Sequence, residues 1–232
     1  MEPEIIFEDD SFLVLNKPSG WITNEAFTTN NQPVVQTWLK ENFKYSLIGD
    51  REARDGIVHR LDKETSGILV VAKTMDAFTE LQRQFKERII EKSYIALAHG
   101  KIDPAEGEIK AAVGRLPWRR DRFGILPGGR DSLTYYKVKT YYDEYTLVEM
   151  FPKTGRTHQI RIHLKHIGHP IVGDAFYAGR KTARKDRVWC ARLFLHAASI
   201  KFIHPVTKKE VHYEAELAGD LVEVLSKLLP KA

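Results

Sequence analysis

The chain has 232 residues, of which 43% are hydrophobic and 29% are charged, a balance that supports a sizeable core and excludes a disordered chain. The single cysteine, Cys190, excludes an internal disulfide and a cysteine-rich zinc site, and we expect it to be buried. No apolar run approaches the length of a membrane span, and the acidic start MEPEIIFEDD is unlike a signal peptide. We therefore expect a cytoplasmic protein without a membrane partner.

The formal net charge is +5, which favours a polyanionic partner. The basic residues gather in two Gly-flanked segments, GRLPWRRDRFG (114–124) and GRKTARKDR (179–187). Each is predicted to be an exposed loop. Taken alone, each loop is as readily explained by solvation as by contact with phosphate groups.

In the first third of the chain, residues 4–17 predict two short strands around an Asp-Asp turn, and 33–43 carry a weak helical pattern after a proline. The apolar run at 67–73 is bounded by glycine and indicates a central strand. The clearest helix follows, with Thr74 as its cap, Asp76 in its first turn and one apolar stripe made of Phe78, Leu81, Phe85 and Ile89.

Further along, residues 92–100 predict a strand and 132–152 a hairpin around Asp143-Glu144. Residues 156–170 fit both strand and helix spacing, but Thr157 as a cap, with Gly168 and Pro170 at the end, favours a helix. The last predicted elements are a hairpin from 194–205 and 210–217 and a helix at 220–229. Paired strands with irregularly placed helices predict an α+β fold with a largely antiparallel sheet, forming a single domain over residues 1–232.

The segment HRLDKETSG (59–67) places Asp62 among His59, Arg60 and Lys63. If residues 57–62 are extended, Arg60 and Asp62 point to the same side. One interpretation is a structural salt bridge at a turn, which contributes about 0–1 kcal/mol when exposed. The other is a carboxylate that neighbouring cations keep ionised, available as a nucleophile or base.

Other chemistries lack the residues that they need. His158, His163, His166 and His169 occur without an HExxH motif, so we expect them to pack or to touch phosphate, and we expect no metal site. No GxSxG, P-loop or GxGxxG motif is present. The remaining carboxylate, tyrosines and arginines suit cofactor-free chemistry on a nucleotide.

Four segments in order resemble motifs of the RluA family of pseudouridine synthases. GIVHRLDKETSGILVVAKT (56–74) resembles the central motif, and LVLNKPSGW (13–21) the N-terminal NKPxG segment. KSYIALAHG (92–100) resembles the family's KxYxAxxxG strand, and TGRTHQIRIHLKHIGHPIVGD (154–174) its last long motif. The stretch after NKPSG lacks the histidine that is often found there. The resemblance covers residues from about 10 to 217.

This resemblance implies the pseudouridine synthase fold, a mixed and mostly antiparallel sheet with flanking helices and a central RNA-binding cleft. It implies an enzyme that converts uridine in RNA to pseudouridine without metal or cofactor. Asp62 then matches the essential aspartate, Tyr94 the tyrosine that stacks on the target base, and Arg161 the basic residue that pairs with the aspartate. Whether Asp62 attacks C1′, attacks C6 or removes the C2′ proton stays open.

The resemblance further implies that Arg60 lies beside the flipped-out nucleotide and that Arg156 contacts RNA. Trp118, Arg119 and Arg120 are candidates for an RNA clamp, although Trp118 could equally pack on its own hairpin. The S4 RNA-binding domain of many relatives is not expected here, which favours a compact stem-loop of tRNA or rRNA as substrate. We expect the protein to be a monomer. The competing hypothesis is an RNA-binding or ribosome-assembly factor on the same fold that has lost catalysis.

Overall fold

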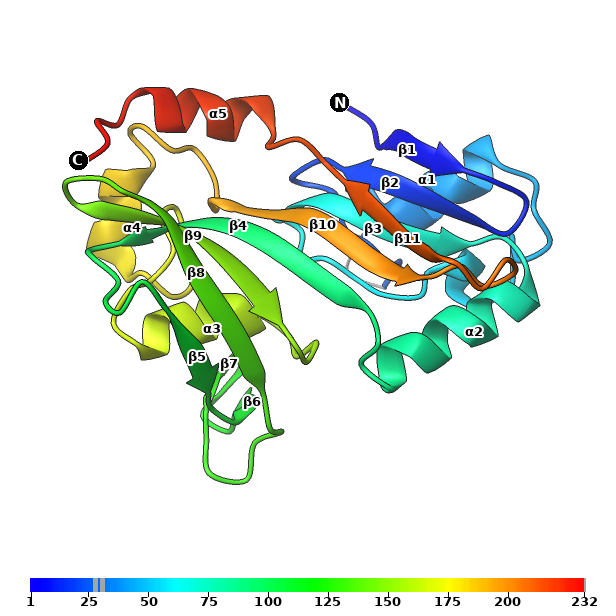
Figure 1. Ribbon diagram of the computed structural model, residues 1–232, viewed down its shortest axis with the longest axis horizontal. Helices are drawn as coiled ribbons and strands as arrows, with labels where there is room; N and C mark the ends of the chain where they lie inside the picture. The colour runs from blue at the N-terminus through cyan, green and yellow to red at the C-terminus, as the bar shows by residue number, and fades with distance from the viewer. Residues whose placement is uncertain (27–28, 30–31, 232) are drawn as a thin grey trace. The chain divides into compact units, whose positions relative to one another are not determined.

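The computed structural model describes residues 1–26, 29 and 32–231, with the backbone alone at 120 and 121. They divide into two units, which Figure 1 shows. Unit 1 is Met1–Glu91 with Ala197–Glu216, and unit 2 is Lys92–His196 with the chain from Leu217 on. The single domain expected over residues 1–232 stays a prediction.

Unit 1 contains a sheet in the order β1-β2-β3-β10-β11, in which β10 belongs to this unit from Ala197 on. Its strands are Glu4–Glu8, Phe12–Lys17, Ser66–Ala72, Leu195–Ile203 and Glu210–Glu214. β1, β2 and β3 pair antiparallel, as do β10 and β11. The helices of this unit are α1 (Val35–Asn42), α2 (Met75–Lys86) and the 3₁₀ turn η1 (Arg54–Gly56).

The apolar runs of β2 and β3 are continuous because both faces of these strands are covered. Leu13 and Leu69 belong to the cluster that contains Leu39 of α1, whereas their neighbours Phe12 and Val70 belong to the cluster that contains Leu81 of α2. Successive side chains of a strand point to opposite faces, so one helix packs on each face. The predicted central strand is confirmed as β3.

In unit 2, four strands pair antiparallel in the order β4-β9-β8-β5, formed by Glu91–His99, Tyr145–Pro152, Leu133–Tyr141 and Glu106–Lys110. A separate hairpin joins β6 (Val113–Leu116) to β7 (Arg119–Ile125). The helices are α3 (Gln159–His166), α4 (Arg180–Asp186) and α5 (Gly219–Ser226). Residues of β4, β9, α3 and α5 share one buried apolar cluster, which also contains Cys190. Burial raises the pKa of the Cys190 thiol to about 11, as suits a packed cysteine.

The α+β fold with a mostly antiparallel sheet is confirmed, whereas several local predictions are wrong. Ile89 is not on the apolar stripe of α2, because the helix ends at Lys86 and Arg88 takes a left-handed φ of 62°, which leaves Ile89 exposed. Thr157 does not cap α3, whose N-cap residue is His158. Thr74 does cap α2, since its Oγ1 accepts a hydrogen bond from the Ala77 N–H.

The two basic segments are not loops. Residues 114–124 lie mostly in the β6–β7 hairpin, and 179–187 contain α4. None of the helices in the described part of the chain is long and apolar enough to cross a membrane.

Gly67, the last residue of HRLDKETSG, is required by close packing of two backbones. Its φ is +108°, and a Cβ at this position would meet the Ala197 carbonyl oxygen of β10 at 2.2 Å. We expect Gly67→Ala to lower the stability by more than about 2 kcal/mol, because the clashing atom is backbone and cannot rotate away. Chemical denaturation followed by circular dichroism measures this change.

Gly49→Ala is the matched control, because Gly49 has a φ of +87° and no atom within 4 Å of the added Cβ. Gly49→Ala is expected to lower the stability by about 1 kcal/mol, from the backbone strain alone. Equal losses in the two variants would contradict the packing argument.

Candidate functional site

Asp62 lies in the irregular segment between the 3₁₀ turn and β3 of unit 1. Its side chain is partly buried, Arg60 is exposed and Leu61 is buried. The Asp62 carbonyl accepts a hydrogen bond from the Thr65 N–H at 3.1 Å, which closes a turn directly before the strand. The carboxylate is therefore carried by a short loop with a defined backbone.

A buried lysine ties this loop to the NKPSG segment. Lys17 is 0% exposed, and its ammonium donates to the carbonyl oxygens of Pro18 (3.0 Å), Trp21 (2.9 Å) and Lys63 (3.3 Å). Burying an ammonium is costly unless it is hydrogen-bonded, and three carbonyls meet its three donors. The charge thus holds the backbone on the C-terminal side of Asp62.

Further bonds join the same two segments. The Gly20 N–H donates to the Lys63 carbonyl at 2.8 Å, and Ser19 Oγ donates to the Glu64 carbonyl at 2.9 Å. On the N-terminal side of Asp62, the buried Thr23 hydroxyl donates to the Leu61 carbonyl at 2.9 Å and accepts from its N–H at 3.2 Å. Residues 17–23 therefore brace Asp62 from both sides.

The side chains of His59 and Lys63, which flank Asp62 in sequence, make contacts with other parts of unit 1. His59 Nε2 accepts a hydrogen bond from the Val70 N–H at 2.9 Å, so this nitrogen carries no proton, and the ring stacks on Phe85 with centroids 4.9 Å apart. Lys63 Nζ donates to Gln32 Oε1 at 2.8 Å. His59 is a structural residue that fastens the HRLD segment to β3 and α2.

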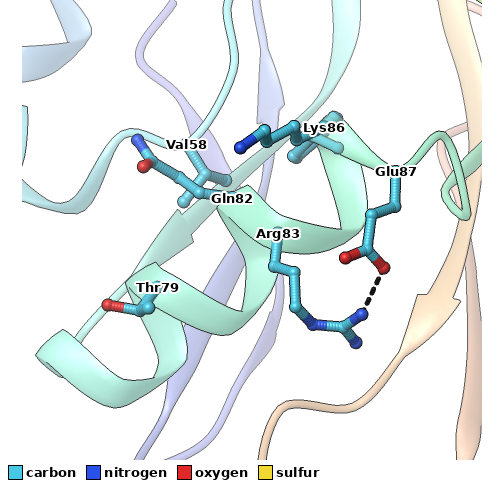
Figure 2. A pocket seen from close by; sticks show the side chains of 7 residues that line it. Val58, Thr79, Gln82, Arg83, Lys86 and Glu87 are labelled. Carbon is cyan, nitrogen blue, oxygen red and sulfur yellow. Dashed lines mark hydrogen bonds and ion pairs between the residues drawn. The ribbon is translucent and has the colours of Figure 1, made fainter.

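A pocket of about 500 Å³ opens beside this segment in unit 1 (Figure 2). Its wall is mostly one face of α2, and Arg83 there is paired with Glu80 and Glu87. The pocket is lined by Val58, Thr79, Gln82, Arg83, Phe85, Lys86 and Glu87. These lining residues include none of the predicted site residues, so we assign it no role.

Tyr94 lies on β4 of unit 2, opposite Met150 of β9, and packs partly buried against the main core cluster. Lys92 points to the same side of the strand, because the two residues are two positions apart. Burial and the neighbouring Lys153 lower the pKa of Lys92 to about 8. Lys92 was not predicted to be special, although it begins the KSYIALAHG motif.

Arg161 is 4% exposed on α3 and forms a bidentate ion pair with Asp174. The Nε–Oδ2 distance is 2.8 Å and the Nη2–Oδ1 distance 2.9 Å. Asp174 is fully buried and also accepts from the N–H groups of Phe176 and Tyr177. The guanidinium carbon lies 5.1 Å from the Tyr177 ring centroid and 5.5 Å from that of Phe176. This pair fixes the plane of the guanidinium, and Asp174 is the acid that ends the predicted motif 154–174.

The remaining predicted residues lie in unit 2, except Arg60. Arg156, just before α3, is partly exposed and donates weakly to the Asp131 carbonyl at 3.4 and 3.5 Å. Trp118 is 71% exposed at the tip of the β6–β7 hairpin, so it does not pack on its own hairpin, and Arg119 beside it is exposed. The side chain of Arg120 lies outside the described part of the chain.

Three of the four histidines near α3 have contacts within the protein, whereas His166 is exposed. His163 is fully buried with Nε2 3.2 Å from the Ala111 carbonyl, and burial lowers its pKa. His158 Nδ1 lies 2.9 Å from the Tyr177 hydroxyl, and His169 Nδ1 lies 2.8 Å from the His99 carbonyl. Among the described residues, no group of three or more His, Cys, Asp or Glu side chains is arranged to hold a metal ion.

A sequence profile described as RNA pseudouridylate synthase matches residues 11–166. The chain therefore belongs to the RNA pseudouridylate synthase family, whose members isomerise uridine in RNA. The resemblance found in its motifs is confirmed, and with it the class of enzyme and RNA as the partner.

Two curated relatives are ribosomal large subunit pseudouridine synthase D of Vibrio vulnificus (strain CMCP6) and of Zymomonas mobilis subsp. mobilis (strain ATCC 31821 / ZM4 / CP4). The first is 36% identical over 233 residues, covering 97% of this chain and 70% of that protein. The second is 38% identical over 232 residues, covering 97% and 72%.

Among solved structures, human RNA pseudouridylate synthase domain containing 1 superposes with a TM-score of 0.76 and 28% identity, covering 99% of this chain and 89% of that one. Human RNA pseudouridylate synthase domain containing 4 has a TM-score of 0.75 and 23% identity, covering 98% and 94%, and supports the fold.

Lys17→Met should lower kcat by about 100-fold on RNA that the wild type modifies, because it releases the loop that carries Asp62. It should also reduce stability by about 1–3 kcal/mol, since buried carbonyls lose their donor. Single-turnover kinetics with saturating RNA and urea denaturation measure the two effects.

Lys63→Met is the control, since Lys63 is exposed and follows Asp62 directly. It should leave kcat within about threefold of the wild type, because it contributes its backbone and not its ammonium to the brace. A Lys17→Met enzyme with wild-type kcat would contradict the positioning role.

Lys92 should make stability depend on pH. Its folded pKa of about 8 lies below the unfolded value of about 10.4. Between these values the unfolded state binds more protons, so the free energy of unfolding rises with pH there, and below pH 8 the cost of the buried charge is fully present. Relative to Lys92→Met, the wild type should gain on the order of 1 kcal/mol between pH 8 and 10.

Urea denaturation of both proteins at pH 7, 8, 9 and 10 measures this difference. Comparing each protein with itself across pH removes the contribution of contacts that the substitution deletes. A constant difference across the whole range would show that Lys92 titrates as an ordinary lysine.

Proposed function

We propose that this protein converts a uridine of large-subunit ribosomal RNA to pseudouridine. The observation that best supports this proposal is the sequence identity of 36% with a ribosomal large subunit pseudouridine synthase D over 97% of the present chain. A stem-loop that contains the target uridine is the proposed recognition element, with the monomer as the active form and the cytoplasm as its location.

The reaction moves one bond and one proton. The bond from C1′ to N1 breaks, uracil rotates, C5 bonds to C1′, and the proton on C5 is lost while N1 gains one. No electron acceptor or leaving group is needed. The protein has to extrude the nucleotide, hold uracil while it is detached, and supply an anion and a base.

Asp62 is the proposed anion, and the brace by residues 17–23 supports this role. A reacting carboxylate has to be held to within a fraction of an ångström, and hydrogen bonds on both sides of Asp62 give its loop that rigidity. It acts by attack on C1′, by attack on C6 or by removal of the C2′ proton.

Tyr94 and Arg161 are proposed to serve the same uridine. A tyrosine ring stacked on a base contributes about 1–3 kcal/mol, which offsets the few kcal/mol that extrusion costs, and Tyr94 is also the proposed base for the C5 proton. Arg161 is proposed to keep Asp62 ionised. Asp174 supports this role because its bidentate pair fixes the plane of the guanidinium. The guanidinium is rigid, so all of its N–H groups then point in fixed directions.

The other predicted residues are proposed to hold the RNA. Arg60 would occupy the space that the extruded nucleotide leaves, and Arg156 would contact phosphate. The exposed Trp118 and Arg119 would form a clamp at the hairpin tip together with Arg120. An exposed tryptophan beside arginines suits base stacking with phosphate contacts.

Asp62→Asn and Asp62→Ala should each lower pseudouridine formation by at least 10⁴-fold, because neither side chain carries a negative charge. Tritium release from RNA that contains [5-³H]uridine measures the reaction, and filter binding shows whether RNA is still held. Asp10→Asn is the control, since Asp10 is exposed in the turn before β2 and should keep full activity. An active Asp62→Asn enzyme would refute the mechanism.

Mapping pseudouridines in a strain that lacks the gene tests the substrate. We expect a position in large-subunit ribosomal RNA to lose its pseudouridine and to regain it when the wild-type gene, but not the Asp62→Asn gene, is returned. Loss confined to tRNA would overturn the proposed substrate while leaving the reaction intact.

A further inference from the structure

The outer face of α4 is the most strongly charged surface that the proposed mechanism leaves unused. Five cationic side chains lie between residues 180 and 187, and all five are exposed: Arg180, Lys181, Arg184, Lys185 and Arg187. Five is also the formal net charge of the whole chain. Removal of this one cluster would leave a chain without a net charge.

The acids of the described residues do not compensate these cations. In the described part of the chain, none of the five is in an ion pair. Four other exposed lysines of unit 2 are paired with acids, whereas Lys101, Lys110, Lys153 and Lys165 are exposed singly without an ion pair in the same part of the chain. The paired ones are Lys137 with Glu106, Lys139 with Glu149, Lys227 with Glu223 and Lys231 with Asp143. What distinguishes α4 is the density of its exposed cations, five within eight residues, none of which is paired with an acid of the described residues.

The acid that α4 does contain is turned inward. Asp186 is 2% exposed, and its carboxylate accepts from the Gly173 N–H at 2.9 Å and lies 3.0 Å from His99 Nε2. Ala183, 4% exposed, is the other buried residue of the helix. These two residues orient α4 so that every exposed residue of the helix is a cation, with Thr182 partly buried.

This arrangement opposes helix stability. Arg180 and Arg184, like Lys181 and Lys185, are spaced four residues apart, where like charges repel. Arg180 and Lys181 also lie at the positive end of the helix, and the first turn contains no acid. Residues that destabilise their own helix are expected at functional sites, where a bound ligand relieves the repulsion between them.

We propose that the outer face of α4 binds the phosphodiester backbone of RNA outside the target nucleotide. The inference rests on the proposed function, because RNA is the polyanion that this family modifies. The helix is about 10 Å long, which matches about three phosphates along one strand. Asp174, which orients Arg161, is six residues before Arg180, so the segment that follows the proposed catalytic residues leads directly into this surface.

The test replaces four of these cations by glutamine in one variant, R180Q/K181Q/R184Q/K185Q. Glutamine preserves helix propensity, so the change is one of charge. The matched control is K137Q/K139Q/K227Q/K231Q, which removes the same charge from the same unit at positions that are already paired. Circular dichroism confirms that both variants are folded.

Fluorescence anisotropy with a 30-nucleotide poly(U) RNA, at salt concentrations between 50 and 300 mM, gives the affinity and its salt dependence. Each lost phosphate contact on a single strand lowers the slope of log K against log salt by about 0.7, so the α4 variant should lose about 2 from its slope. Its affinity at 50 mM salt should fall at least tenfold. The control should keep the wild-type slope, with an affinity within about threefold.

Equal losses in the two variants would mean that net charge alone attracts RNA, and would overturn the proposal. So would an unchanged slope in the α4 variant, or a loss of binding to phosphatidylserine vesicles without a change on RNA. If the fourfold variant does not fold, R184Q/K185Q should lose about half as much slope. Poly(U) binding does not depend on catalysis, so a wild type that forms no pseudouridine would refute the proposed function and leave this result standing.

Discussion

A lysine ammonium without access to water joins the two segments on which the candidate site depends. Lys17 ends β2, and Gly67 lies opposite it at the start of β3. The NKPSG segment therefore leaves the sheet where the HRLDKETSG segment enters it. The three carbonyls that Lys17 reaches lie in residues 18–21 and in HRLDKETSG. A buried charge is tolerated only while all its donors are used, so a displaced loop would leave an uncompensated charge. The geometry around Asp62 is held in one arrangement for that reason.

Elements with a strong apolar period could be predicted from the sequence. The apolar runs 12–15 in β2 and 68–72 in β3 are continuous because a helix covers each face, and α2 has an apolar stripe and a threonine cap. α4 could not be predicted, because five of the eight residues from 180 to 187 are cationic and it contacts the core mainly through Ala183 and Asp186. The exposed Ile89 was misplaced because the left-handed turn at Arg88 is set by packing and not by periodicity.

Candidate site residues could be proposed where they lie in recognisable motifs, and their roles stay predictions, whereas the partners that hold them could not be predicted. Asp62, Tyr94 and Arg161 stand out because four motifs occur in order. The pairing of Arg161 with Asp174 depends on how the chain folds back over the thirteen positions that separate the two residues, and no local pattern encodes that path. The same holds for Thr23 and Leu61, which are far apart in sequence and form two hydrogen bonds. His59 was expected to be a cation beside Asp62, but its Nε2 is an acceptor in the packing of β3.

The charged residues of unit 2 follow two different physical rules. Arg161 is buried and its charge is compensated by Asp174, because an unpaired guanidinium in the interior would be costly. Such a compensated pair exerts little long-range field, so it can orient a substrate but cannot attract one. The five cations between residues 180 and 187 are exposed and have no acidic partners among the described residues, which gives them a field that reaches across a Debye length of about 8 Å at physiological salt. The two proposals thus assign attraction of RNA and chemistry on its uridine to different residues. A substitution on α4 would be expected to change binding and its salt dependence before it changed the chemical step.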